Sequence, residues 1–298
     1  MNKTMTKAPQ SFRKYVALVL QAIKRFFRKV EDFVLPIAPW LAAGLTFGVL
    51  VFLVGHILIN GIPFINPSLF SLEYNSDNVS LLPAFITTII MVFLSLLIAA
   101  PLGLFTAIYL VEYAQRGNRL VRMVRITVET LSGIPSIVYG LFGSLFFVGW
   151  LGWGYSVLAG TFTLSIMILP LIMRTAEESL KSVPDSYREG SFALGAGKLR
   201  TIFRIILPAA MPGILSGVIL AMGRIVGETA ALIYTAGTVA QIPTSLFNSA
   251  RTLAIHMWAL SSEALHTGQA YATAVVLLVL VIGINLLSAA LAKKIAKV

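Results

Sequence analysis

The sequence has no cysteine, few histidines and few acidic residues. Its 298 residues include 12 Asp and Glu, 3 His and 23 Lys and Arg. Without cysteine the chain can form no disulfide and no thiolate metal site, and it has no cysteine nucleophile. The three histidines, His56, His256 and His266, lack the spacing of metal ligands, so we expect no metal site.

Apolar residues, by contrast, are abundant. The chain is 57% hydrophobic and only 12% charged, with a mean hydropathy of +0.87. A soluble domain of this length would struggle to bury so much apolar surface in one core, whereas a lipid bilayer can solvate it. The composition therefore predicts a membrane protein.

Six apolar stretches are long enough to cross a bilayer, because a helix spanning a hydrocarbon core of about 30 Å needs roughly 20 residues. The charge-free run between Glu129 and Arg174 is long enough for two spans. We expect it to turn at the Gly- and Trp-rich residues 149–155. The other four spans are predicted at about 37–59, 83–110, 207–234 and 271–292. The expected fold class is an all-α integral membrane protein with six transmembrane helices.

The basic residues indicate how these helices are oriented. Residues 1–35 carry eight Lys or Arg, 111–129 carry four, 174–204 carry six and the tail after Ala292 carries three. Because these segments all fall on one side of the predicted spans, the positive-inside rule places both termini in the cytoplasm. The same distribution accounts for most of the net charge of +11, so nucleic-acid binding is not expected.

The segment before the first span has helical periodicity. Between Ser11 and Asp32, apolar residues recur at helical spacing among basic ones. This pattern predicts an amphipathic helix on the cytoplasmic membrane surface, and a basic retention signal is the alternative. We expect three parts: a basic N-terminal segment at 1–35, the first span with its outer loop at 36–82, and a core of five spans at 83–298.

The cytoplasmic loop 174–204 has helix signals of its own. Pro184-Asp185-Ser186 is a favourable helix start. The cluster Gly195-Ala196-Gly197 is expected to end that helix, and a second helix from Leu199 leads into the fifth span. A short helix held below the membrane between two spans suits docking to a cytoplasmic partner.

Within this loop the sequence resembles the EAA signature of ABC importer permeases. Six residues fall at the spacing of the signature: Glu189, Gly190, Ser191, Gly195, Leu207 and Pro208. The signature has Ala at the second and third of these positions, where this chain has two other small residues. The resemblance implies a type I (MetI-like) ABC importer permease fold, with a coupling helix that sits in a cleft of a separate ATPase subunit.

A nucleotide-binding loop is not expected in this chain. The stretch 195–199 superficially resembles one, but Phe192 stands where the first glycine belongs and Leu199 where Ser or Thr would bind magnesium. We therefore expect the chain to bind no cofactor and to be no enzyme. ATP and magnesium would be used by the partner ATPase.

Two opposite charges, Arg224 and Glu228, lie inside the predicted fifth span. Four residues apart on a helix they share a face, so a self-neutralising ion pair is one interpretation. A substrate pathway is the other, because ionisable residues inside membranes usually face one. Arginine can donate two parallel hydrogen bonds to an oxyanion; Glu228 would orient the guanidinium, and Thr229 could donate a further bond. Gly223 and Gly227 would allow close helix approach or a locally adaptable backbone.

The same segment is similar to a signature of one group of these permeases. Residues 224–230, Arg-Ile-Val-Gly-Glu-Thr-Ala, resemble the Arg-x-x-Gly-Glu-Thr signature of the permeases of phosphate-specific (Pst) ABC importers. Residues 230–236 resemble the A-type subunit more than the C-type subunit, and 134–143 resemble the third-span motif of that family. The resemblance covers roughly residues 80–292.

This second resemblance implies a permease for inorganic phosphate in the bacterial cytoplasmic membrane. The implied partners are a C-type permease subunit, a dimer of the ATPase subunit, an extracytoplasmic phosphate-binding protein and membrane lipid. An importer of another oxyanion, such as sulfate, molybdate or phosphonate, is the alternative within this class. A channel or secondary transporter is the alternative outside it, and the EAA-like loop argues against that one.

Overall fold

The computed structural model describes residues 10–115 and 117–295, and all regular structure in these ranges is helical. The α-helices are α1 (Gln10–Gly61), α2 (Leu82–Ile108), α3 (Arg119–Ser132), α4 (Ser136–Gly143), α5 (Val157–Lys181), α6 (Asp185–Ala193), α7 (Lys198–Thr201), α8 (Leu207–Val226), α9 (Ala230–Ile233), α10 (Leu253–Glu263) and α11 (Thr267–Ile295). Turns of π-helix follow α2, α4 and α7 at Tyr109–Tyr113, Ser144–Trp150 and Ile202–Ile206, and 3-10 turns occupy Ile62–Phe64 and Pro67–Phe70. The predicted all-α fold class is confirmed.

The chain divides into two compact units, residues 1–56 and 57–298. In the first unit, α1 carries the N-terminal segment and the first span on one continuous helix, with Pro36 and Pro39 inside it. The helix ends at Gly61, close to the predicted end of the first span at about residue 59. Most side chains of residues 11–32, on which the prediction of an amphipathic surface depends, lie outside the described residues, as do those of the basic C-terminal tail.

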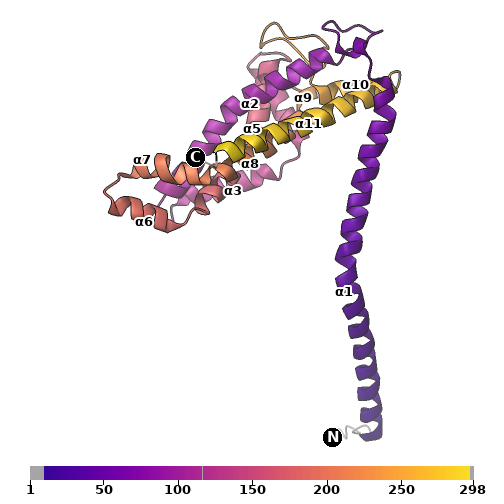
Figure 1. Cartoon of the computed structure of the whole chain (residues 1–298), viewed down its shortest axis with the longest axis vertical. Helices are drawn as coiled ribbons and strands as arrows, with labels where there is room; N and C mark the ends of the chain where they lie inside the picture. The colour runs from indigo at the N-terminus through magenta and orange to yellow at the C-terminus, as the bar shows by residue number, and fades with distance from the viewer. Residues whose placement is uncertain (1–9, 116, 296–298) are drawn as a thin grey trace, which may run out of the picture. The chain divides into compact units, whose positions relative to one another are not determined.

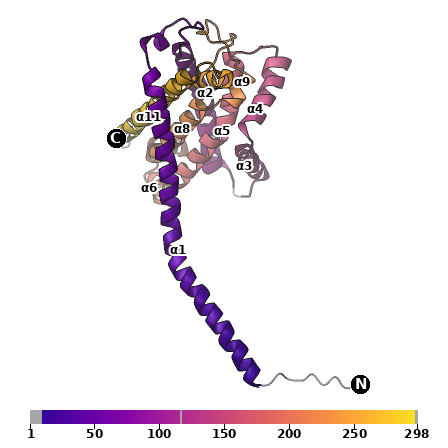
Figure 2. The same ribbon diagram turned by 90° about the vertical axis from the view of Figure 1, so that its right-hand side faces the viewer.

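Helices α2, α5, α8 and α11 form the bundle of the second unit (Figures 1 and 2). Helix α5 packs against both α2 and α8. Buried apolar side chains from all three meet in one core, among them Met91, Ile168 and Ile225. Figure 1 shows α6 and α7 at one end of this bundle and α10 at the other. The bundle thus separates two polar regions of the chain.

Two glycines let α8 approach α5 closely. A Cβ atom added at Gly213 would overlap Ser179, and one added at Gly217 would overlap Thr175. Small residues four apart commonly make such contacts between membrane helices. Close helix approach at Gly223, one of the two interpretations of that glycine, is not found among the described residues, because a Cβ at that position meets no atom within 4 Å.

Replacing Gly217 with valine is expected to force α5 and α8 apart. Overpacking a tight contact costs about 1–3 kcal/mol, and the midpoint of thermal unfolding in detergent measures that loss. Gly223→Ala is the matched control on the same helix, because its added methyl group meets open space. The control is expected to unfold no earlier than the wild type. Equal midpoints for the two variants would contradict the packing described above.

The third span is bent. Helix α3 and the segment Ser136–Trp150 meet at 103°, because Gly133 and Pro135 between them interrupt the helix. In the described residues, five helices are long and apolar enough to cross a membrane, or six if this bent pair is one span. The predicted turn at 149–155 is confirmed, and two of its glycines have left-handed φ values of +66° and +64°.

Candidate functional site

The loop between α5 and α8 contains the two short helices that the sequence predicted. Helix α6 begins at Asp185, and Gly195 follows it with a left-handed φ of +81°. One boundary differs from the prediction: α5 continues to Lys181 rather than ending near Arg174. We call residues 182–206 the coupling loop from here on.

The residues of the EAA-like signature divide between the surface and the interior of this loop. Glu189, Gly190, Gly195 and Pro208 are exposed, Leu207 is partly buried and Ser191 is buried. The hydroxyl of Ser191 lies 2.8 Å from that of Thr201, which ties α6 to α7. Ser191 therefore holds the two helices together, and the exposed members of the signature remain available to another protein.

Large apolar side chains are exposed on the same loop. Tyr187, Phe192, Leu194 and Leu199 are all exposed, Leu194 by 90%. Exposed apolar groups that lie close together among charged residues commonly mark an interaction surface. The coupling loop thus presents such a surface at one end of the bundle (Figure 1).

Arg188 anchors α6 to the bundle through an ion pair that the sequence did not indicate. Its Nη2 lies 2.7 Å from Oε1 of Glu112, in the π-helical turn after α2, and its Nη1 lies 3.1 Å from Asp185. The guanidinium also donates to the carbonyl oxygens of Leu180 and Val183. Arg188 therefore joins the coupling loop to the ends of both α2 and α5.

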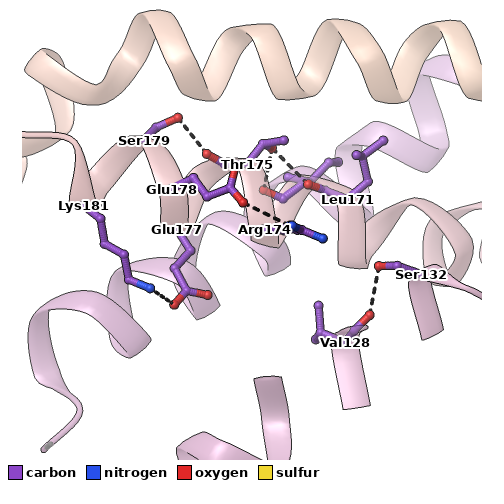
Figure 3. A network of polar contacts seen from close by, with 10 residues as sticks. Val128, Ser132, Leu171, Arg174, Thr175, Glu177, Glu178, Ser179 and Lys181 are labelled. Carbon is purple, nitrogen blue, oxygen red and sulfur yellow. Dashed lines mark hydrogen bonds and ion pairs between the residues drawn. The ribbon is translucent and has the colours of Figure 1, made fainter. Parts of the chain in front are cut away.

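A second set of ion pairs fixes the end of α5. Glu177 lies 2.6 Å from Lys181, and Arg174 lies 3.0 Å from Glu178 (Figure 3). Glu177 also pairs with Arg125 of α3 at 2.8 Å. The Arg174–Glu178 pair is exposed and contributes little, but the Glu177 side chain is only 11% exposed. Its pair with Arg125 holds α3 against α5, and its pair with Lys181 lies within α5.

Arg224 lies at a groove between α5, α8 and α11. The groove has a volume of about 610 Å³, and Leu171, Ser216 and Asn285 line it together with Arg224. Arg224 has no hydrogen bond or ion pair with any described residue. Its five N–H donors are therefore available to an anion in the groove.

A second cavity continues this groove toward the coupling loop. It has a volume of about 380 Å³, shares Ser216 and Leu220 with the first, and is also lined by Thr175, Ser179 and Ser182. Hydroxyl groups, together with the carboxylate of Glu178, thus line the space beside α8 from the level of Arg224 to the start of the loop. Ser216 and Asn285 were not predicted as site residues, although the amide of Asn285 within an apolar span is a signal present in the sequence.

Glu228 does not pair with Arg224 in this structure. Helix α8 ends at Val226, whereas the sequence predicted a span to residue 234, so a spacing of four residues no longer puts the two side chains on one face. The carboxylate of Glu228 is 8% exposed and accepts a hydrogen bond of 3.1 Å from the backbone N–H of Ala231. Glu228 therefore caps the first turn of α9 from the position before the N-cap residue, Thr229.

The break after α8 has a local cause. Gly227 loses more backbone entropy in a helix than any other residue type, and the side chains of Glu228 and Thr229 offer the backbone alternative hydrogen bonds. Thr229 makes a long contact of 3.5 Å with the carbonyl of Gly227. Of the three predicted pathway residues, Arg224 lies at the groove, whereas Glu228 and Thr229 lie at the break between α8 and α9.

Comparisons with known proteins agree with this architecture. Residues 99–297 match the family described as binding-protein-dependent transport system inner membrane component. The probable ABC transporter permease protein YqgI of Bacillus subtilis is 34% identical over 256 residues, which cover 79% of this chain and 85% of that protein. The phosphate transport system permease protein PstA 1 of Mycobacterium tuberculosis is 38% identical over 205 residues, covering 68% of this chain and 67% of that protein.

Solved structures share the fold at lower identity. A bacterial alginate ABC transporter, solved in complex with a periplasmic protein, superposes with a TM-score of 0.63 at 16% identity, over 93% of this chain and 98% of that one. The MetNI methionine ABC transporter gives a TM-score of 0.55 at 21% identity, over 72% of this chain and 93% of that one. At these identities the likeness concerns the fold, which is that of a type I importer permease.

Proposed function

Because the chain belongs to the family of binding-protein-dependent transport system inner membrane components, we propose that it is a permease subunit of an ABC importer for inorganic phosphate. Relatives named as phosphate transport system permease proteins support phosphate as the cargo. The Lys- and Arg-rich segments, which include the coupling loop, face the cytoplasm in this proposal.

The observation that carries the proposal is the unpaired guanidinium of Arg224 at the groove of the bundle. A planar guanidinium donates two parallel hydrogen bonds to phosphate oxygens. Ser216 and Asn285 line the same groove and can donate or accept without adding charge, so they can also bond the protonated oxygen of phosphate. A single positive charge, that of Arg224, among neutral groups can bind the anion without holding it so tightly that it cannot be released.

The partners follow from what this chain does not supply. A dimer of ATPase subunits would provide ATP hydrolysis and dock on the exposed apolar side chains of the coupling loop. A C-type permease subunit would form the other wall of the pathway, and an extracytoplasmic phosphate-binding protein would deliver the anion. The solved alginate transporter with its periplasmic protein supports this last kind of partner.

Uptake of radiolabelled phosphate by cells that depend on this importer tests the proposal. We expect uptake to require this chain and ATP, and to be unaffected by a large excess of sulfate, molybdate or a phosphonate. Displacement of phosphate by one of these anions would identify a different oxyanion as the cargo. Transport that is indifferent to ATP would favour a channel or secondary transporter.

Glu228→Gln is expected to retain most of the uptake, and Glu228→Ala to lose more of it. Glutamine can still accept the Ala231 N–H that Glu228 accepts in the structure, whereas alanine cannot. Losing such a cap costs about 0.5–2 kcal/mol of local stability. Uptake at equal amounts of membrane protein compares the two variants, and an equal loss in both would show that the charge matters rather than the cap.

A further inference from the structure

Arg251 is a buried arginine without an internal partner. It lies just before α10, is 6% exposed, and its Nε and Nη2 atoms have no hydrogen-bond acceptor among the described residues. Glu73 and Asp77 belong to the same loop as Tyr74, which contacts Arg251, but neither forms an ion pair with Arg251. A buried charge is costly unless an anion or acceptor compensates it.

The two unpartnered nitrogens make up one edge of the guanidinium. This edge can donate two parallel hydrogen bonds to a single oxyanion. Arg188 uses the same edge in this protein: its Nε and Nη2 donate to Oε1 of Glu112 at 3.1 and 2.7 Å. At Arg251 the equivalent edge is buried, and no carboxylate of the described residues occupies it.

Tyr74 occupies the face of the same guanidinium. Its ring centroid lies 4.5 Å from Cζ of Arg251, an arrangement that stabilises the cation and leaves the in-plane edge free. Tyr74 is held in place by the turn that follows it, where the side chain of Asn75 accepts the N–H groups of Asp77 and Asn78. The orientation of Arg251 is therefore fixed before any ligand arrives.

Two further buried polar side chains lie near Arg251. They are Thr252, whose hydroxyl makes no cap to the first turn of α10, and His256, whose ring nitrogens make no hydrogen bond of regular geometry and face the backbone of Val79. The ring of His256 lies 6.1 Å from that of Tyr74, centroid to centroid. Burial and the charge of Arg251 lower the pKa of His256 to about 3, so its imidazole is neutral and can donate one hydrogen bond.

We propose that Arg251, Thr252 and the first turn of α10 form a second site for a tetrahedral oxyanion of the phosphate class, at the end of the bundle opposite the coupling loop (Figure 1). The N-terminus of an 11-residue helix adds a favourable potential for an anion. This inference rests on the proposed phosphate import, in which the site receives the anion before it reaches Arg224.

Residues 74–80 cover the site in this structure. Within them Val79 is 1% exposed and has a φ of +45°, which is strained for a β-branched residue. Strained residues of this kind cluster at ligand clamps and switch regions. In this proposal an anion reaches Arg251 when this segment moves away from it.

A fluorescent reporter at Tyr74 tests the site without measuring transport. In the full chain purified with its partner subunits, Tyr74→Trp places an indole on Arg251, where it stacks at least as well as tyrosine. Inorganic phosphate, added without ATP or binding protein, is expected to change the emission saturably. Adding Arg251→Gln is expected to weaken the affinity for phosphate by about a hundredfold or more, the effect of losing two hydrogen bonds to a charged group.

Two matched variants separate this site from the pathway at Arg224. Arg251→Lys keeps the positive charge but loses the edge that donates two parallel hydrogen bonds, so an intermediate fluorescence response to phosphate is expected. Arg224→Gln is expected to keep the full fluorescence response, because it leaves the edge of Arg251 unchanged. Co-purification with the partner subunits shows that each variant assembles. A phosphate response that survives Arg251→Gln, or none in any variant, would overturn the proposal.

The source of the anion is distinguished by the added probe. A response to sulfate but not to phosphate would overturn the site for an anion of the phosphate class, and the uptake measurements would decide the cargo separately. A response to the binding protein alone, with none to free anions, would mean that a carboxylate of that protein occupies the edge of Arg251. That outcome would overturn the oxyanion site and leave the proposed importer function intact.

Discussion

Replacing Arg224 with glutamine is expected to abolish phosphate uptake. Glutamine keeps much of the side-chain length but loses the positive charge and the two-pronged donor that faces the groove. Two hydrogen bonds to a charged group contribute about 1.5–3 kcal/mol each, so the loss is about a hundredfold or more. Initial rates of radiolabelled phosphate uptake at equal amounts of assembled complex measure it.

Two companion variants show whether the loss at Arg224 concerns the anion. Arg224→Lys keeps the positive charge but loses the planar group that donates two parallel hydrogen bonds. This variant is expected to transport phosphate at an intermediate rate. Arg119→Gln makes the same chemical change at an exposed position of α3 and is expected to transport normally. Normal uptake by a fully assembled Arg224→Gln complex would exclude Arg224 as a contact of the transported anion.

Replacing Arg188 with methionine is expected to destabilise the protein and to uncouple ATP hydrolysis from phosphate. The change leaves Glu112, whose side chain is 8% exposed, buried without its partner, and breaking a buried pair in this way costs about 3–5 kcal/mol. It also removes the bonds by which α6 is held to α2 and α5. The midpoint of thermal unfolding measures the first effect, and phosphate-stimulated ATP hydrolysis by the assembled complex measures the second.

A double-mutant cycle isolates the buried charge as the cause. Glu112→Gln alone is expected to lower the stability less than Arg188→Met does, because Arg188 keeps Asp185 and two carbonyl oxygens as acceptors. Glu112→Gln combined with Arg188→Met leaves no uncompensated charge and is expected to regain most of the lost stability. If the double variant unfolds as early as Arg188→Met, an unpaired Glu112 is not the reason for the loss.

Local sequence signals were sufficient for the elements that depend only on neighbouring residues. The start of α6 at Asp185 and the break at Gly195 follow from helix capping and from the φ values that glycine permits. The turn at 149–155 was predicted for the same reason. These features were correct because each is decided within a few residues of the chain.

The helix that was predicted too long shows where local reasoning failed. The apolar run from Leu207 to Tyr234 is compatible with a single span, and nothing in its hydrophobicity requires a break. The structure ends α8 at Val226 and uses Glu228 to cap α9. The competing side-chain hydrogen bond and the cost of Gly227 in a helix outweighed the apolar pattern.

Contacts between distant parts of the chain could not be predicted at all. Glu112 and Arg188 are 76 residues apart, and Arg251 is covered by Tyr74 from a segment far earlier in the sequence. The close approach of α8 to α5 at Gly217 is equally invisible in either helix alone. Each contact depends on which helices lie side by side.

The sequence by itself determined that this chain is an all-helical membrane protein with a helical loop between its fourth and fifth spans. It also showed which charged residues lie in or between the apolar spans. The tertiary structure alone decided how each arginine is used: Arg188 is neutralised by Glu112, Arg224 faces a groove and Arg251 is buried without a partner. The reason is physical, since hydrophobicity and helix signals act over a few turns, whereas the pairing of charges depends on distances that helix packing sets.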